Sequence, residues 1–323
     1  MPETRVGISG WSYKEFRGKF YPRGLAQRLE LEYASERMNS IEINGTFYSL
    51  QTPSSFEKWA AATPDDFQFA IKGSKYITHQ KKLTDIRVPL ANFFAQGLLK
   101  LGKKVGPILW QFPPWYRFNR ERLTDFLDLL PRTTAEAAEL ATENTINGPN
   151  DSFIDLIEDV PLRYAFEPRH KSFFSEEMVL LLREYNAALA FADTAGKFPY
   201  AEDLTSDLIY IRLHGSTELY ASGYTEAELD DWASKIRSWS EGREPRGVVK
   251  VVPGKFETGI KRDVYVYFDN DIHSHAPYDA ISLANKLKSE ATTLIKKGGR
   301  LNGRLLIKKE IARLRRCDEV HVG

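Results

Sequence analysis

Eight short runs of β-branched and aromatic residues recur along the chain, and each stops abruptly at polar or charged residues. They span residues 5–10, 40–45, 67–73, 106–112, 163–169, 188–194, 208–215 and 263–270. Most are followed by a stretch with helical periodicity, and a strand–helix alternation repeated eight times is typical of a closed parallel barrel. The sequence therefore predicts an α/β, TIM-barrel-like (β/α)8 fold in which the carboxyl ends of all strands meet at one mouth.

The connections between these runs predict helices and two insertions. Helical patterns occupy residues 25–38, 54–62, 89–104, 175–185, 225–239 and 277–297. Ser175 before two glutamates, and Thr225 three residues before Glu228, are typical helix starts. An insertion after the fourth strand runs through residues 119–130, an alanine-rich helix at 135–141, and residues 152–157. Residues 195–207 are too short for a full helix, and Gly, Pro and charge at 241–261 indicate a flexible or hairpin-like insertion.

A basic extension, residues 298–323, follows a barrel domain predicted over residues 1–297. Residues 296–316 carry nine basic residues against one acid, Glu310, with Leu and Ile interleaved. This pattern favours a helix that packs an apolar side on the barrel, and it leaves nucleic-acid binding open as the alternative.

Composition limits the classes of protein to which the chain can belong. With 45 basic and 44 acidic residues the net charge is +1, which gives no whole-chain indication of polyanion binding. The single cysteine, Cys317, excludes an intrachain disulfide and a Cys-based zinc cluster. No secretion signal and no run of eighteen apolar residues is present, so we expect a cytoplasmic protein without a membrane partner. The oligomeric state is not determined by the sequence.

Alternation along the strands indicates which side chains enter the barrel, because neighbours on a strand point to opposite faces. Polar residues share one phase near the strand ends, while isoleucine, leucine and phenylalanine take the other. The polar set is Glu42, Asn44, Lys72, Gln111, Glu167, Arg169, Asp193, Arg212 and His214. In the last strand Asp269 is in phase with Tyr265 and Tyr267, whereas Asn270 falls on the apolar face unless the strand has already ended.

These residues predict acid/base chemistry at the mouth. Two carboxylates in unlike environments can divide acid and base roles, so Glu167 is the first catalytic candidate and Glu42 the second. Glu42, close to Lys72 on the adjacent strand, should stay ionised. His214 should titrate near neutrality. Asp193 is the fourth catalytic candidate.

Cations and rings at the mouth suggest how a substrate is held. Lys72, Arg169 and Arg212 suit a phosphate or carboxylate. Trp11 and Tyr13 suit stacking on a sugar or a base. Further aromatic residues crowd the same loops, at Phe47, Tyr48, Trp115 and Tyr116. Packing of the loops over the barrel top is the alternative for these rings.

Two other interpretations of the charged set stay open. The carboxylates Glu42, Glu167 and Asp193 could simply pair with the three cations and close the barrel top as an ion-pair network. Glu167, Asp193 and His214 could instead hold a divalent metal, although no HExxH or CxxC spacing supports one. No other cofactor is predicted.

Motifs along residues 5 to about 290 resemble the YecE-like family, also called domain of unknown function 72. They are Gly7-Ile-Ser-Gly-Trp-Ser-Tyr13, Phe20-Tyr-Pro22, Ile41-Glu-Ile-Asn44 with Thr46-Phe-Tyr48, Trp59 before Thr63-Pro64, Phe67-Gln-Phe-Ala-Ile-Lys72, Gln111-Phe-Pro-Pro114, Phe166-Glu-Pro-Arg-His170, Asp193, Ile211-Arg-Leu-His-Gly215 and Tyr267-Phe-Asp-Asn-Asp271. The resemblance implies a TIM-barrel-like fold, and it adds His170 and Asn270 to the mouth without assigning chemistry. The segment 132–161 and the basic extension depart from the family pattern.

We therefore expect an enzyme that cleaves a phosphodiester or glycosidic bond in a small, anionic, ring-containing substrate. A nucleic-acid-binding protein without turnover, using the mouth and the basic tail, is the alternative from another class. A metal-dependent phosphodiesterase is the third hypothesis.

Overall fold

The computed structural model describes residues 2–148, 151–253 and 259–298. Two compact units divide the chain, Met1–Leu283 and Ala284–Gly323. The barrel and its mouth belong to the first unit. The basic extension predicted for residues 298–323 lies outside the described residues, apart from residue 298 at the end of the last helix.

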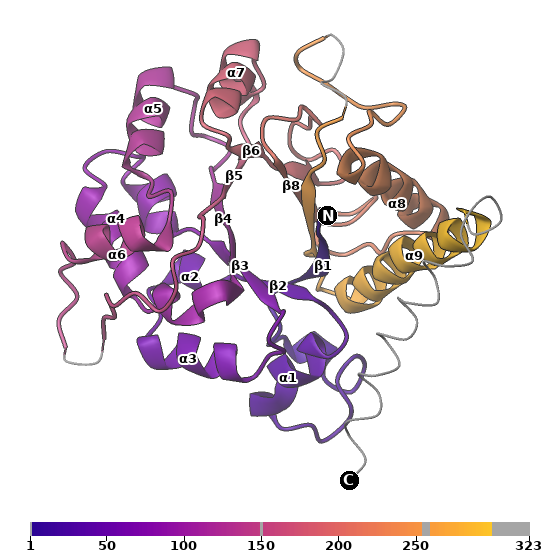
Figure 1. The fold of residues 1–323 in the computed structure, drawn as a ribbon, viewed down its shortest axis with the longest axis horizontal. Helices are drawn as coiled ribbons and strands as arrows, with labels where there is room; N and C mark the ends of the chain where they lie inside the picture. Colours follow the sequence, from indigo (N-terminus) through magenta and orange to yellow (C-terminus); the bar gives the residue numbers. More distant parts are fainter. Residues whose placement is uncertain (1, 149–150, 254–258, 299–323) are drawn as a thin grey trace. The chain divides into compact units, whose positions relative to one another are not determined.

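The first unit contains one parallel sheet curled around an axis, with helices on its outside (Figure 1). Its strands are β1 (Thr4–Ser9), β2 (Ser40–Ile43), β3 (Gln68–Lys72), β4 (Val105–Gln111), β5 (Tyr164–Glu167), β6 (Ala188–Leu189), β7 (Phe191–Asp193), β8 (Leu208–Leu213) and β9 (Asp263–Phe268). They are hydrogen-bonded in the order β6-β5-β4-β3-β2-β1-β9-β8-β7. Every pair is parallel, which confirms the predicted α/β, TIM-barrel-like fold.

The sheet curls until its two edges meet at the sixth predicted strand. This strand is divided in two at Ala190, into β6 and β7. Its first half, β6, pairs with β5 through Ala188 and Leu189. Its second half, β7, pairs with β8. Ala190 itself donates its backbone N–H to the carbonyl of Phe166, 2.8 Å away. One short segment therefore joins the two edges of the sheet.

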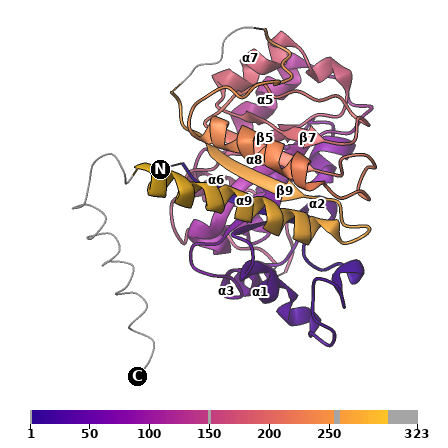
Figure 2. The same ribbon diagram turned by 90° about the vertical axis from the view of Figure 1, so that its right-hand side faces the viewer.

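Helices follow most strands and cover the barrel on its outer side. They are η1 (Lys14–Phe16), η2 (Gln27–Leu29), α1 (Glu30–Ser35), α2 (Gly45–Tyr48), α3 (Pro53–Ala61), η3 (Tyr76–Gln80), α4 (Arg87–Ala95), η4 (Leu98–Lys104), α5 (Arg120–Leu129), α6 (Thr134–Ala141), η5 (Lys171–Phe173), α7 (Glu176–Glu184), α8 (Glu226–Ser240) and α9 (His275–Gly298). Figure 2 shows α8 running alongside β9. In the insertion after β4, α6 packs on α4.

Local sequence explains where several helices begin and end. Ser175 caps α7, and Thr225 with Glu228 forms the predicted capping box at the start of α8. The predicted helix at 89–104 is instead two helices, because Gly97 adopts a left-handed φ of 115° that ends α4. The helix predicted from residue 25 begins later, with η2 and α1.

The insertion after β4 contains the two helices expected at residues 119–130 and 135–141, as α5 and α6, whereas its last part and the second insertion have little regular structure. Residues 152–157 form no helix, and Phe153 instead makes an isolated bridge with Gln96. The part of 241–261 that the structure describes contains no strand, so the hairpin form of that prediction is not observed there. Glu202 and Asp203 hold this segment by accepting backbone N–H groups of residues 249, 251 and 252.

The barrel interior is filled by small side chains on one side and tyrosines on the other. Ala70, Ala165 and Ala188 line β3, β5 and β6, whereas Tyr210, Tyr265 and Tyr267 enter from β8 and β9. The large rings occupy the space that the alanines leave, as a close-packed interior requires. Two residues further along β3, β5 and β8, on the same inward-facing side, stand the charged residues Lys72, Glu167 and Arg212. Alternation thus predicted the inward-facing set.

Candidate functional site

Arg212 lies at the centre of the barrel, one layer above the tyrosines. Its Nη1 donates to Glu167 at 2.8 Å, and its Nη2 donates to Glu42 at 2.8 Å and to Asp269 at 2.9 Å. We call Arg212 and these three carboxylates the arginine cluster. Both terminal nitrogens are engaged and the residue is fully buried. Arg212 therefore has no exposed surface with which to hold a substrate anion, contrary to the sequence-based hypothesis.

Glu42, at the end of β2, is held by three different donors. Ser9 donates to its Oε1 at 2.7 Å and Tyr210 donates to its Oε2 at 2.5 Å, in addition to the bond from Arg212. The side chain is completely buried. A carboxylate with both oxygens engaged and no exposed surface is a fixed counter-charge and is poorly placed for proton exchange with a substrate.

Glu167, at the end of β5, joins the cluster to Arg169 at the mouth. Arg169 donates to Glu167 Oε1 at 2.9 Å, while Oε2 accepts from Arg212. Burial alone would raise the pKa of Glu167, but the neighbouring Arg212 and Arg169 hold that pKa below its usual range. Glu167 is therefore ionised at neutral pH, which suits a residue that orients arginines and does not suit a general acid.

Arg169 keeps part of its surface open, unlike Arg212. It donates to the Tyr220 hydroxyl at 3.2 Å and lies 4.7 Å above the ring of Phe198. Its side chain is 12% exposed. It is the member of the predicted anion-binding set that an incoming phosphate or carboxylate can still reach.

His214 follows β8 and is fully buried beside Arg212 and Asp269. Its Nε2 lies 3.4 Å from Nη1 of Arg212, and because a guanidinium only donates, Nε2 is the acceptor. Its Nδ1 lies 3.0 Å from Asp269 Oδ2, although not along a hydrogen-bonding direction. Burial, followed by repulsion from Arg212, lowers the pKa of His214. The imidazole is therefore neutral at neutral pH, and the expected titration near neutrality is not supported.

Two carboxyl groups after β9, Asp269 and Asp271, have their pKa values displaced in opposite directions. Burial opposes ionisation of Asp269, but Arg212 and His214 lower its pKa to about 2. Burial, followed by repulsion from Asp269, raises the pKa of Asp271 well above its usual range. Asp271 Oδ1 is buried without a hydrogen-bond partner among the described residues. The pair thus places a carboxyl group whose surroundings favour the ionised form, Asp269, close in sequence to one whose surroundings favour the protonated form, Asp271.

Lys72, at the end of β3, is a buried cation that forms no ion pair with a carboxylate of the described residues. Its side chain is nearly enclosed, and in the described part of the chain its Nζ makes no hydrogen bond, lying instead 4.6 Å from the ring centre of Phe47. Burial, followed by repulsion from Arg212, lowers the pKa of Lys72 to about 8. About one tenth of this amine is therefore uncharged at pH 7, far more than for a lysine with the ordinary pKa of 10.5.

A cavity of 300 Å³ opens beside the mouth at the ends of β1 and β2. Its lining is aromatic and uncharged, and includes the predicted residues Trp11, Tyr13 and Asn44 together with Tyr48 and Trp59. Trp11 meets Trp59 edge to face at 5.3 Å between ring centres. Asn44 donates to the carbonyl of Ser9, while its buried Oδ1 has no donor. The ring-binding hypothesis therefore coincides with a real cavity.

The other predicted site residues lie around the arginine cluster but are not part of it. Asp193 accepts from the Tyr224 hydroxyl at 2.9 Å, and burial raises its pKa. Gln111 is buried next to Glu167 in strand register. His170 caps η5 by accepting the N–H of Ser172. Asn270 lies beyond the end of β9 and donates to Asp279 and Ser222, which makes it a loop anchor.

Ionised groups at the mouth do not form a metal site in the described part of the chain. No group of three or more His, Cys, Asp and Glu side chains there could hold a metal ion. In particular, Glu167, Asp193 and His214 bind arginine, tyrosine and arginine respectively. The geometry gives no support to the metal hypothesis.

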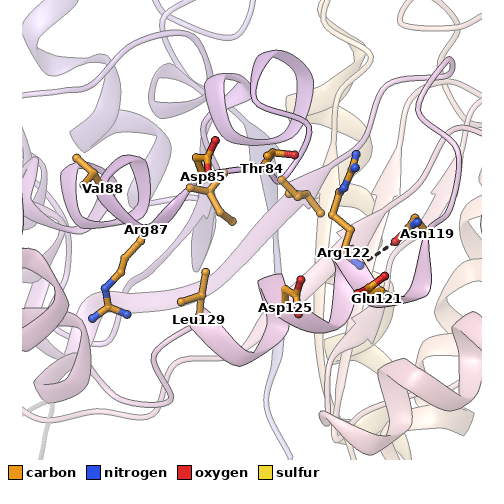
Figure 3. A pocket seen from close by; sticks show the side chains of 11 residues that line it. Thr84, Asp85, Arg87, Val88, Asn119, Glu121, Arg122, Asp125 and Leu129 are labelled. Atoms are coloured by element: carbon orange, nitrogen blue, oxygen red, sulfur yellow. Dashed lines mark hydrogen bonds between the residues drawn. The ribbon is translucent and has the colours of Figure 1, made fainter.

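A second, larger cavity of 680 Å³ lies between the start of α4 and helix α5 (Figure 3). Its charged lining is mixed in sign, with Asp85, Arg87 and Asp125 among the residues drawn. Arg87 is already bound to Glu143. None of the predicted site residues lines this cavity.

Three residues important to the site were not predicted. Asp269 was recognised as in phase with the inward tyrosines, which was the available signal, but it was not assigned to the site. Asp271 follows the end of β9, where alternation no longer predicts direction. Tyr210 reaches Glu42 from a strand far away in the sequence, and only the closed barrel brings the two together.

Comparison with known proteins places this geometry in a family. A family model described as a protein of unknown function, DUF72, matches residues 5–301. The UPF0759 protein YunF of Bacillus subtilis is 28% identical over 123 residues, which cover 36% of this chain and 43% of that protein. The UPF0759 protein YecE of Escherichia coli is 30% identical over 128 residues, 39% of this chain and 44% of that protein. The matched region thus spans less than half of each relative.

Solved structures extend the likeness in fold to most of the chain. A DUF72 family protein from Thermotoga maritima has a TM-score of 0.65 at 23% identity, covering 89% of this chain and all (100%) of that one. One from Enterococcus faecalis has a TM-score of 0.64 at 16% identity, covering 88% and 95%. Within the described residues, no helix is both long and apolar enough to cross a bilayer. Because the family model spans nearly the whole chain, this protein belongs to the DUF72 family.

Proposed function

We propose that this barrel is an enzyme that cleaves a phosphodiester or glycosidic bond in an anionic, ring-containing substrate by acid/base chemistry at the mouth. The observation that carries the proposal is two buried ionisable groups at one rim: Asp271, whose Oδ1 has no hydrogen-bond partner among the described residues, and Lys72, whose Nζ makes no hydrogen bond there. Burial raises the pKa of Asp271 and lowers that of Lys72. Groups whose environments displace their pKa values in this way are suited to proton transfer at neutral pH.

The structure supports a different division of roles from the one expected from sequence. A water molecule attacks the phosphorus or the anomeric carbon, and the uncharged form of Lys72 takes a proton from that water. As the bond to the leaving oxygen breaks, Asp271 gives its proton to that oxygen. Glu167, Glu42 and Arg212 are positioning residues, because their fixed charges surround Asp271 and Lys72. Asp193 and His214 hold neighbouring loops and Asp269. Arg169 receives the anionic group, and the cavity at Trp11 receives the ring.

Hydrolysis of chromogenic model substrates tests the proposal. Bis(4-nitrophenyl) phosphate and 4-nitrophenyl glucuronide are both anionic and ring-containing, and each releases nitrophenolate on cleavage. We expect turnover to increase with pH towards about 8 as Lys72 loses its proton. Asp271→Asn, which keeps the shape but removes the acidic proton, should lower the rate constant by about 100-fold or more.

A matched variant separates this effect from general loss of charge. Asp65 is exposed and precedes β3, at the opposite end of the barrel, so Asp65→Asn should leave turnover unchanged. Equal activity of Asp271→Asn and the unchanged protein on a cleaved substrate would rule out the assignment of the proton donor. If no cleavage of either substrate class is seen at any pH, the proposed reaction is wrong.

A further inference from the structure

A line of aromatic rings runs along the loops at the carboxyl ends of β1 to β4. Trp59 meets Trp11, and both share the uncharged cavity with Tyr48. Tyr48 meets Phe47 at 5.1 Å, Phe47 meets His79 at 5.3 Å, and His79 meets Trp115 at 6.3 Å between ring centres. We call these six residues the ring strip. Its members come from four separate segments of the sequence.

The ring strip is open to solvent at points along its length. Tyr48 is 66% exposed and Trp115 is 54% exposed. Exposed apolar surface gathered in one place, unlike single exposed residues, is typical of a site that meets a partner. The cavity at the Trp59 end supplies an enclosed site, while Trp115 supplies an open one.

Cations accompany the rings. Lys72 lies 4.6 Å from the ring centre of Phe47, Lys75 lies 5.1 Å from that of Tyr48, and Lys82 lies 5.2 Å from that of Trp115. Among the described residues none of these three lysines is ion-paired with a carboxylate. Lys72 is buried, whereas Lys75 is half-buried and Lys82 is exposed, so the positive charges of Lys75 and Lys82 are available to an incoming anion.

The loops beside the ring strip are strongly basic as a group. Residues 73–86, 112–119 and 168–175 together contain six Lys and Arg residues against one acid, Asp85. That acid lies 3.9 Å from Lys81. Repulsion from Lys72, Arg169 and Lys75 contributes, after burial, to lowering the pKa of His79 to about 4. A chain with a net charge of +1 thus concentrates positive potential at one side of its mouth.

From this alternation of rings and cations we infer that the mouth binds a single-stranded nucleic acid. Bases would stack on Trp115 and Tyr48, one base would enter the uncharged cavity, and phosphates would lie against Lys75 and Lys82. Stacking is tolerant of sequence, because every base presents a flat face.

Other polyanions match the surface less well. A duplex hides the faces of its bases, so the exposed rings would have no partner in it. A sulfated polysaccharide would satisfy the lysines but leaves the repeated flat rings unexplained. Single strands use both features, which is the arrangement of an electrostatic groove lined by stacking platforms.

The inference names a substrate class for the proposed phosphodiester cleavage, and in that respect it rests on the proposed function. Binding itself does not need turnover. It is therefore measured on Asp271→Asn, in which the proposed proton donor is absent, so that failure of the docking surface and failure of the chemistry give different results.

The experiment is fluorescence anisotropy of a fluorescein-labelled 12-nucleotide single strand, as DNA and as RNA, titrated with full-length protein at several salt concentrations. We expect Trp115→Ala to weaken binding about tenfold, the effect of one lost stacking contact, and Trp115→Phe to restore most of it. Lys75→Glu with Lys82→Glu should reduce the slope of log affinity against log salt by about 1.4, since each phosphate contact contributes about 0.7 for single strands.

Controls separate the ring strip from other basic surfaces. Lys103 is exposed just before β4, at the amino end of the barrel, so Lys103→Glu should leave affinity and salt slope unchanged. Circular dichroism of each variant verifies folding. Blunt duplex and heparin serve as competitors and should displace the labelled strand only at much higher concentration.

Three results would overturn the inference. One is the absence of detectable binding at low salt. Another is binding that Trp115→Ala and the double lysine variant leave intact, which would place it elsewhere on the chain. The third is displacement by heparin as efficient as by unlabelled single strand, which would show attraction by charge alone. If the protein cleaves the nitrophenyl substrates but does not bind the labelled strand, the nucleic-acid inference is wrong and the proposed enzymatic function still stands.

Discussion

At the scale of single residues, the centre of the barrel depends on charge compensation. Arg212 is surrounded by Glu42, Glu167 and Asp269, so one positive charge faces three negative ones, with Lys72 and Arg169 close by. Buried charges are tolerated only when partners replace their hydration. The cluster therefore fixes which groups stay ionised, and leaves Lys72 and Asp271 as the ones whose protonation is displaced.

Replacing Arg212 should leave three buried carboxylates without their cation. We expect Arg212→Met to lower the free energy of unfolding by about 3–5 kcal/mol, the usual effect of breaking a buried ion pair from one side. Urea denaturation at pH 7 measures it. Arg87→Met removes an arginine from the exposed pair with Glu143 and should change stability by less than about 1 kcal/mol. Similar values for both variants would contradict the buried role of Arg212.

The lowered pKa of Lys72 predicts how the free energy of unfolding changes with pH. Its folded-state pKa of about 8 lies below the ordinary value of 10.5, so between these values the unfolded chain binds more protons. Stability should therefore rise with pH across this window, relative to Lys72→Met, which lacks the group. Below pH 8 the variant should be the more stable protein. Urea midpoints of both proteins from pH 7 to 10 test this, and a difference that does not vary with pH would refute it.

At the scale of elements, the site depends on where each strand and helix ends. Thr46 in α2 donates its hydroxyl to the carbonyl of Lys72 at 2.6 Å and so ties the end of β3 to the loop after β2. The break between α4 and η4 similarly lets the chain turn towards β4. Gly97 at this break has φ 115°, and a Cβ there would lie 2.4 Å from Cα of Pro53.

Gly97→Ala should therefore destabilise the fold by two effects, backbone strain and a clash with α3. We expect a loss of about 3 kcal/mol or more in the free energy of unfolding. Gly24→Ala is the matched control, because Gly24 also has a positive φ, 83°, but nothing lies within 4 Å of its added Cβ. It should lose only about 1–2 kcal/mol. Thermal melts compare the stabilities of Gly97→Ala and Gly24→Ala. Equal losses of stability would show that the backbone at Pro53 shifts at little cost to make room for the added methyl group.

At the scale of the whole molecule, some features follow from sequence patterns and others only from closure. Alternation predicted that Glu42, Lys72, Glu167 and Arg212 share the barrel interior, because strand phase is a local property. Alternation does not say how far below the mouth a side chain lies. Residues that were expected to contact substrate, such as Arg212, are therefore buried instead. The basic surface beside the ring strip was not predicted, since its basic residues come from separate loops. The basic residues that stand close together in the sequence are those of the tail.

Closure itself should be testable at Ala190, where the strand ring passes from β5 to β8. Proline there removes the N–H that Ala190 donates to Phe166, while Ala190→Gly retains this donor and loses only one methyl group. We expect Ala190→Pro to lower the free energy of unfolding by about 3 kcal/mol and Ala190→Gly by about 1 kcal/mol. Because the ring joins strands from both halves of the chain, the loss should appear as one cooperative transition at lower urea, with the slope against urea unchanged. If Ala190→Pro is instead as stable as Ala190→Gly, or unfolds in two separate steps, the segment Ala188–Asp193 does not hold the two edges of the sheet together.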